Sequence, residues 1–127
     1  MPAEVEAAIR SWSGPGAVDH SGLHIDLPEI VDNGNDVPLG IRFDEPVRPE
    51  RRSGAPRVLR LSVWAPRNPQ PLALEAEFTS ACARADLMTR IRLATSQSIV
   101  VVARMDDGRI RRAEQPVLVA LAACVES

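Results

Sequence analysis

The chain has 127 residues, 45% of them apolar, which is enough for one globular domain with a hydrophobic core. Its formal net charge of -2 argues against a nucleic-acid partner, because phosphate-binding proteins usually carry a basic patch. No apolar run approaches the ~20 residues of a membrane span, and the N-terminus lacks the apolar core of a signal peptide, so we expect neither feature in this chain.

The N-terminal stretch "PAEVEAAIRSW" predicts a short helix. Pro2 suits a first helical turn, and acidic residues follow it where the helix dipole favours them. One apolar face results, at Val5, Ala8, Ile9 and Trp12. The sequence "SGPG" then ends the helix, so residues 1–16 are expected to form a helix and linker that dock on the core.

Beyond residue 16 the apolar residues alternate with a period of two, which indicates strands. The expected strands are "VPLGIRF" (37–43), "RVLRLSVWA" (57–65), "LALEAEF" (72–78), "LMTRIRL" (87–93), "SIVVVARM" (98–105), 109–114 and "PVLVALA" (116–122).

The more continuous apolar run at 98–105 predicts a central strand, and "DDG" at 106–108 predicts a hairpin turn. Asn33-Gly34-Asn35 can form a tight turn with positive φ, and a hairpin or loop between the first two strands is the alternative. Seven short strands with turn signals about ten residues apart indicate an all-β fold, an immunoglobulin-like antiparallel β-sandwich. We assign it residues 17–121 and treat 122–127 as a C-terminal tail.

Candidate catalytic residues are few, so we expect no enzyme activity of the chain itself. His20 and His24 are the only histidines, and a metal site needs three or four ligands, so no metal site is expected. No nucleophile or phosphate-binding motif is present, and no cofactor is expected. One thiol, Cys124, follows the last apolar strand three residues from the C-terminus, where it could be offered to another molecule.

The second thiol, Cys82, lies between two expected strands. It fits a half-buried loop cysteine, and a disulfide between Cys82 and Cys124 is the alternative. Bridging needs Cα atoms within about 7 Å of each other, and the sequence leaves that open.

Three long segments resemble the SoxY family, the sulfur-carrier subunit of bacterial thiosulfate oxidation. They are "LPEIVDNGNDVPL" (27–39), "VWAPRNPQPLALEAEF" (63–78) and "TRIRLATSQSIVVVARMDDG" (89–108). A cysteine near the C-terminus and a short helix before the first strand complete the resemblance, which covers nearly the whole chain.

The resemblance implies an immunoglobulin-like sandwich in the periplasm that pairs with a SoxZ-like β-sandwich subunit. It also implies that a terminal cysteine covalently holds thiosulfate-derived sulfur while separate Sox enzymes load, hydrolyse and oxidise the adduct. By position that cysteine is Cys124. A SoxZ-like subunit would cover a sheet face, for which Trp64 is a candidate contact; a core position for Trp64 is the alternative.

The tail departs from the family at its cysteine. SoxY tails usually place two glycines on each side of it, whereas Ala122, Ala123 and Val125 flank Cys124 here. Alanine and a β-branched residue restrict the backbone more than glycine, so this tail is expected to be stiffer. The alternatives are a non-catalytic immunoglobulin-like interaction module, or a divergent SoxY paralogue with an incidental cysteine. A homodimer linked by a disulfide through Cys124 also stays open.

Overall fold

The computed structural model describes residues 1–44, 57–78 and 86–120. Within these ranges the chain forms one helix, α1 (Ala3–Ser13), and nine strands. The strands are β1 (Val18–Asp19), β2 (Leu23–Asp26), β3 (Ile30–Val31), β4 (Val37–Phe43), β5 (Val58–Trp64), β6 (Leu72–Glu77), β7 (Leu87–Ile91), β8 (Gln97–Met105) and β9 (Ile110–Val119). The prediction of an all-β fold behind a short N-terminal helix is confirmed.

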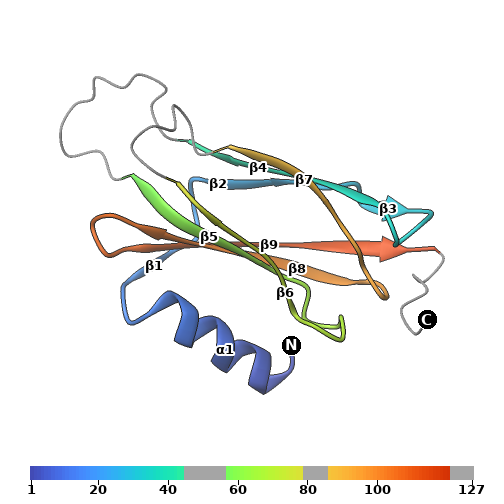
Figure 1. Ribbon diagram of the computed structural model, residues 1–127, viewed down its shortest axis with the longest axis horizontal. Coiled ribbons are helices and arrows are strands. Elements are labelled where there is room, and N and C mark those ends of the chain that lie inside the picture. Colours follow the sequence, from blue (N-terminus) through green and yellow to red (C-terminus); the bar gives the residue numbers. More distant parts are fainter. Residues whose placement is uncertain (45–56, 79–85, 121–127) are drawn as a thin grey trace.

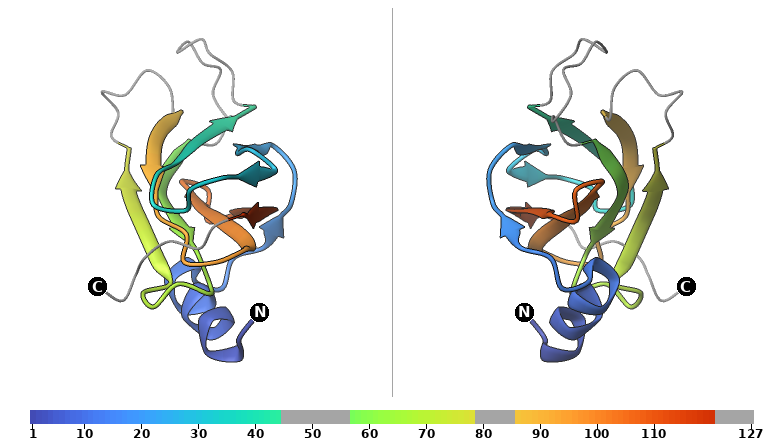
Figure 2. Two further views of the ribbon diagram at one scale, coloured as in Figure 1. Left: turned by 90° about the vertical axis from the view of Figure 1, so that its right-hand side faces the viewer. Right: turned by 90° about the vertical axis from the view of Figure 1, so that its left-hand side faces the viewer.

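The strands form two facing sheets, with α1 on the outer side of the larger one (Figures 1 and 2). The larger sheet has the order β1-β9-β8-β5-β6, with β3 also pairing with β9, and the smaller has the order β2-β4-β7. Most pairs are antiparallel, as expected, but β1 and β3 both run parallel to β9. The molecule is therefore a β-sandwich with a helix as a third layer.

The main core lies between the sheets and follows the predicted alternation. In β4, Val37, Leu39, Ile41 and Phe43 are buried while Arg42 is exposed. The predicted turn after β8 is also present: Gly108 has φ 88°, and its N–H donates to the Met105 carbonyl at 3.1 Å. The central position expected for residues 98–105 is confirmed, since β8 lies between β5 and β9.

A second core lies between α1 and the larger sheet. Val5 and Ile9 pack there against Trp64, Val100, Val102 and Ile110. Trp64 is 5% exposed, and its indole N–H donates to the Ser62 hydroxyl at 2.7 Å. The candidate partner contact at Trp64 is therefore wrong and its core position is confirmed, because α1 covers the face on which Trp64 lies. The same cover explains why β8 is apolar on both faces.

The two strands expected at 109–114 and 116–122 are one strand, β9, which continues through Pro116. Pro116 pairs with Ser98 of β8. On the opposite edge, within the described residues, β1 pairs with residues 110–111 and β3 with residues 118–119. Pro116 lies between the segments that pair with β1 and β3. A proline has no N–H to donate, and its position on this edge of β9 has no described strand beside it, so no hydrogen bond of a described ladder is lost.

The ion pair between Glu6 of α1 and Arg112 of β9 makes the helix contact sensitive to pH. Arg112 donates from Nη1 and Nη2 to the two carboxylate oxygens of Glu6 at 2.8 and 2.9 Å. The hydrogen bond from Arg112 is the main reason that the pKa of Glu6 lies below its ordinary value of 4.5. Because the pKa of Glu6 is lower in the folded than in the unfolded protein, the ion pair stabilises the fold fully at pH values above the pKa of the unfolded state. This stabilisation is lost as the pH falls through the pKa of the folded state.

We therefore expect Glu6→Gln to lower the free energy of unfolding by about 1 kcal/mol at neutral pH and to have little effect well below pH 4. Urea denaturation at a series of pH values measures this. Glu4→Gln, at an exposed position of the same helix, is the control. An equal loss at all pH values would show that the pair does not cause the pH dependence.

Candidate functional site

The predicted site residues lie outside the described part of the chain. These are Cys124 and its neighbours Ala122, Ala123 and Val125; Cys82 lies outside it too. Ala120 is the last described residue before them, and it directly follows β9. We call the last three described residues, Leu118, Val119 and Ala120, the tail base. The candidate site consists of the tail base and of the residues that hold it in place.

Three backbone N–H groups fix the tail base. Leu118 donates to the Glu29 carbonyl and Ala120 to the Val31 carbonyl, each at 2.9 Å, so β3 holds one edge. Between them, Val119 donates to the Ser96 hydroxyl at 2.7 Å. Successive N–H groups of a strand point to opposite edges, and here each finds an acceptor. The last described residues of the chain are thus held from both edges of β9.

The turn that carries Ser96 is itself held by a polar network around Asn68. The Asn68 amide donates to the Arg92 carbonyl at 2.7 Å and accepts the Ala94 N–H at 2.9 Å. Its oxygen also accepts from the Gln97 amide at 3.0 Å, and Gln97 is buried. The network connects the β5–β6 loop to the β7–β8 turn. These are two of the three turns that lie beside the tail base.

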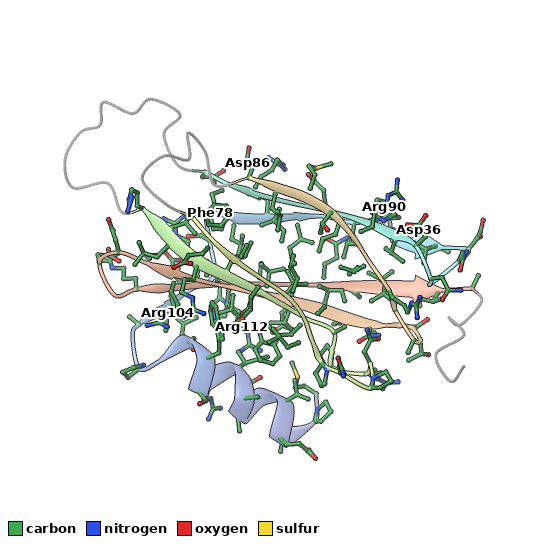
Figure 3. The ribbon with its side chains drawn as sticks, viewed as in Figure 1. Asp36, Phe78, Asp86, Arg90, Arg104 and Arg112 are labelled. Carbon is green, nitrogen blue, oxygen red and sulfur yellow. The ribbon has the colours of Figure 1, made fainter. Side chains whose placement is uncertain are left out.

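The segment 32–36 forms the third of these turns. Asn33 accepts the Asn35 N–H on its side-chain oxygen at 2.9 Å, and the Gly34 carbonyl accepts the Leu93 N–H at 2.7 Å. The chain turns there as a loop, without the positive φ that its sequence allows, since Gly34 is not among the described residues with positive φ. An ion pair between Arg90 and Asp36, at 3.1 Å, ties the turn to β7 (Figure 3).

Sequence analysis missed Asn68, Ser96 and Gln97 as supports of the tail base. The polar clusters "RNPQP" and "TSQS" were visible, but only as loops between strands. The resemblance to the SoxY family could have pointed to these residues, because each of its three segments contains one of the turns beside the tail base.

Removal of the Asn68 side chain is expected to loosen the tail base. Asn68→Ala leaves the Ala94 N–H, the Arg92 carbonyl and the Gln97 amide without their shared partner, which should lower the free energy of unfolding by about 1–3 kcal/mol. Hydrogen exchange at the Val119 and Ala120 amides should accelerate. Asn35→Ala, at an exposed turn position, is the matched control. Unchanged exchange at both amides in Asn68→Ala would contradict this role.

The two histidines do not come together in a site. His20 is exposed, and His24 contacts the Asp44 carboxylate through Nε2 at 2.8 Å. Among residues 1–44, 57–78 and 86–120, no group of three or more His, Cys, Asp and Glu side chains could hold a metal ion. In the same ranges, no helix is long and apolar enough to cross a membrane.

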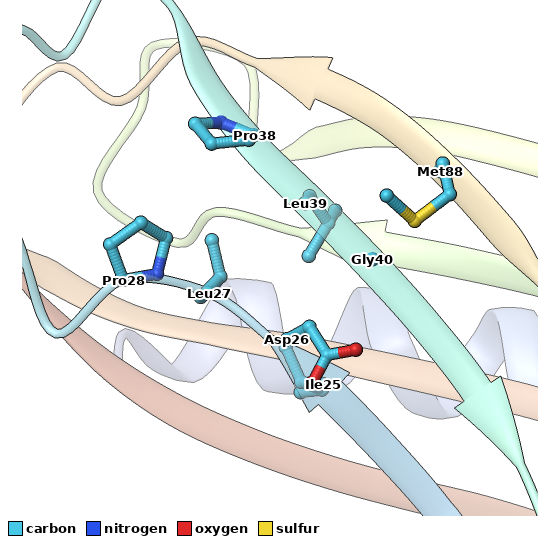
Figure 4. A pocket seen from close by; sticks show the side chains of 8 residues that line it. All are labelled: Ile25, Asp26, Leu27, Pro28, Pro38, Leu39, Gly40 and Met88. Carbon is cyan, nitrogen blue, oxygen red and sulfur yellow. The ribbon is translucent and has the colours of Figure 1, made fainter.

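A shallow groove of about 410 Å³ lies against the smaller sheet (Figure 4). Proline, leucine and isoleucine side chains form much of its lining, together with Gly40 and Met88. Its one carboxylate, Asp26, already accepts a hydrogen bond from Arg42 at 3.0 Å. The groove therefore offers apolar contact but no set of converging polar groups.

Comparison with solved structures identifies the fold. The sulfur carrier protein SoxY from Chlorobium limicola f thiosulfatophilum superposes with a TM-score of 0.73 at 23% identity, covering 94% of this chain and 98% of that one. A superoxide reductase (neelaredoxin) from Ignicoccus hospitalis gives a TM-score of 0.61 at 14% identity, covering 77% and 80% of the two chains.

A putative superoxide reductase from Thermotoga maritima gives a TM-score of 0.60 at 15% identity, covering 85% and 89%. At these identities each likeness shows a shared β-sandwich fold. No curated protein sequence matches the chain significantly. At the level of families, residues 10–124 match the family described as "Sulfur oxidation protein SoxY". The match covers most of the chain and all three resembling segments, and the chain belongs to the SoxY family.

Proposed function

We propose that the protein carries intermediates of thiosulfate oxidation covalently on Cys124. One observation carries the proposal: the SoxY family match extends to residue 124, so that it includes the cysteine at its very end. The sandwich supports the same function, since three hydrogen bonds hold the tail base and leave Cys124 four residues beyond Ala120. Four residues reach at most about 14 Å, which allows entry into an enzyme pocket.

The loading step joins two sulfur atoms. The Cys124 thiol loses its proton to solvent, and a bond forms between its sulfur and the outer sulfur of thiosulfate. Two electrons leave in this step, so a redox enzyme with an electron acceptor, such as an oxidised metal centre, must take them. The product is a cysteine S-thiosulfonate.

Hydrolysis then removes the oxidised sulfur. Water attacks the sulfonate sulfur, the bond between the two outer sulfur atoms breaks, and sulfate and two protons are released. The electron pair stays on the sulfur that remains bound to Cys124, as a persulfide. A further enzyme would oxidise this sulfane sulfur. Because Cys124 only holds the group, other proteins must supply each of these activities.

The partners proposed for this carrier follow from the family. They are a SoxZ-like β-sandwich subunit and the Sox enzymes that load, hydrolyse and oxidise the adduct, all in the periplasm. The alternative is a non-catalytic interaction module or a divergent paralogue in which Cys124 is incidental; Ala122, Ala123 and Val125 around the cysteine motivate it.

Loading with thiosulfate separates these functions. The purified protein is incubated with thiosulfate and the loading enzyme from its host, and intact masses are recorded with and without the enzyme. The intact mass of a carrier rises by that of one S2O3 unit, and peptide mapping of the loaded protein places the gain on the peptide that contains Cys124. An unchanged mass, while a SoxY protein with a glycine-flanked cysteine is loaded in parallel, would reject the carrier function.

A further inference from the structure

Two large apolar side chains are exposed beside the tail base. Ile30 of β3 is 62% exposed and Leu118 of β9 is 59% exposed, and the two are register partners in the parallel β3–β9 pair. Their neighbours Val31 and Val119 pack toward the core between the sheets. Since side chains alternate between the faces of a sheet, Ile30 and Leu118 both lie on its outer face.

The helix on this face does not cover the pair. Its packing partners in the sheet are Trp64, Val100, Val102 and Ile110, and Ile110 is eight residues before Leu118 in β9. Pro116, two residues before Leu118 and on the same face, is also exposed. We call Ile30, Pro116 and Leu118 the apolar patch. Isolated exposed apolar residues are common, but here three neighbouring positions are exposed on one face of the described part of the chain.

The position of the patch relative to the thiol suggests its occupant. Leu118 is six residues before Cys124, so the two Cα atoms lie within about 21 Å of each other whatever path the chain takes. A standard protein interface covers about 800 Å² per partner, a disc roughly 30 Å across. An interface of this diameter, formed around the pocket of an enzyme that binds Cys124, is wide enough to include the apolar patch.

The charges around the patch favour one kind of partner surface. Glu29 precedes Ile30, Asp32 follows Val31, and both side chains are exposed. Within the described ranges neither carboxylate is in an ion pair. A partner with an apolar centre and basic residues at its rim would complement this area.

We propose that the apolar patch is the docking surface for the enzymes that receive Cys124, each presenting an apolar surface with basic residues at its rim beside the pocket for the tail. This inference rests on the proposed carrier function and adds the surface by which the carrier is recognised. Docking at the patch would place Cys124 at the pocket before the tail itself makes contacts.

The test compares charged substitutions on the two sheets. Ile30→Asp and Leu118→Asp each place a carboxylate in the patch, and Met88→Asp, at a position that is 80% exposed on β7 of the smaller sheet, is the matched control. The rate of thiosulfate loading by the host loading enzyme is measured as a function of carrier concentration. We expect both patch variants to load at least tenfold more slowly at low carrier concentration, mainly through a raised KM, and Met88→Asp to load like the wild type.

A second readout distinguishes docking from damage to the tail or fold. The reaction of Cys124 with a small thiol reagent, followed by peptide mapping, needs no docking and should be unchanged in all three variants. Leu118→Ser, which removes the apolar group without adding charge, should show a smaller loss of loading. Wild-type loading rates in both patch variants, Ile30→Asp and Leu118→Asp, would overturn the docking surface while leaving the carrier function intact.

Two other outcomes also count against the proposal. If the wild type is never loaded, the carrier function fails and the docking surface fails with it. If the wild type is a dimer by light scattering and the patch variants are monomers, a second copy of the chain occupies the patch, and the enzyme-docking proposal is wrong.

Discussion

Cys124→Ala is expected to abolish thiosulfate-dependent turnover in a system reconstituted from the carrier and its enzymes. Each proposed step occurs on a sulfur atom bound to this residue, so removal of the thiol leaves no site for the S–S bond to form. The loss should be complete rather than partial. Cys124→Ser should fail equally, because a hydroxyl resembles the thiol in shape but has no sulfur atom with which to form the S–S bond.

The control for this prediction is the second cysteine. Cys82→Ala should support turnover at close to the wild-type rate if Cys124 alone carries the sulfur. Oxygen or electron-acceptor consumption with thiosulfate as the donor measures turnover for all variants. Retained turnover in Cys124→Ala would show that the cysteine is incidental, as the interaction-module alternative requires.

Trp64→Ala is expected to lower the free energy of unfolding more than Glu6→Gln or Asn68→Ala. Trp64 is 5% exposed between α1 and the larger sheet, and its removal would leave a cavity next to Ile9, Val100 and Val102. Replacement of a buried tryptophan or phenylalanine by alanine typically costs about 3–5 kcal/mol. Trp64→Phe should cost less, since it keeps most of the packing and loses the hydrogen bond to Ser62.

Chemical denaturation followed by far-UV circular dichroism measures these differences. Leu72→Ala, at an apolar position that is 40% exposed on β6, should change the free energy of unfolding by less than about 0.5 kcal/mol. If Trp64→Ala were as stable as the wild type, Trp64 would not be part of a core beneath α1, and a contact with another subunit would again be a reasonable explanation for it.

Local patterns in the sequence were sufficient for much of the fold. The alternation in β4 and β7 predicts which residues face the core, because a strand buried on one face needs apolar residues at every second position. The Asp-Asp-Gly turn and the N-terminal helix follow from equally local preferences. Each of these features depends on residues close together in the chain.

The features that sequence analysis did not predict depend on contacts between distant residues. The alternation of β5 places Trp64 opposite Val63, but only the docked helix shows that both faces are buried. The hydrogen bond from Trp12 to Glu75, at 2.6 Å, spans 63 positions. Strands β1 and β3 have two residues each, too short to show a period.

The same distinction applies to the candidate site. The prediction of Cys124 as the carrier residue rests on its position and on the resemblance to SoxY proteins. The hydrogen bond from Val119 to Ser96 could not be predicted, because it joins the last strand to a turn 23 residues earlier. The supports of the tail base come from three turns whose proximity only the folded sandwich reveals.

The most direct test of a sulfur carrier is peptide mapping by mass spectrometry of the protein isolated from thiosulfate-oxidising cells. We predict a thiosulfonate or persulfide on the peptide that contains Cys124 and an unmodified Cys82 peptide. The same peptides without any sulfur adduct, or joined to each other by a disulfide in all of the isolated protein, would contradict the account.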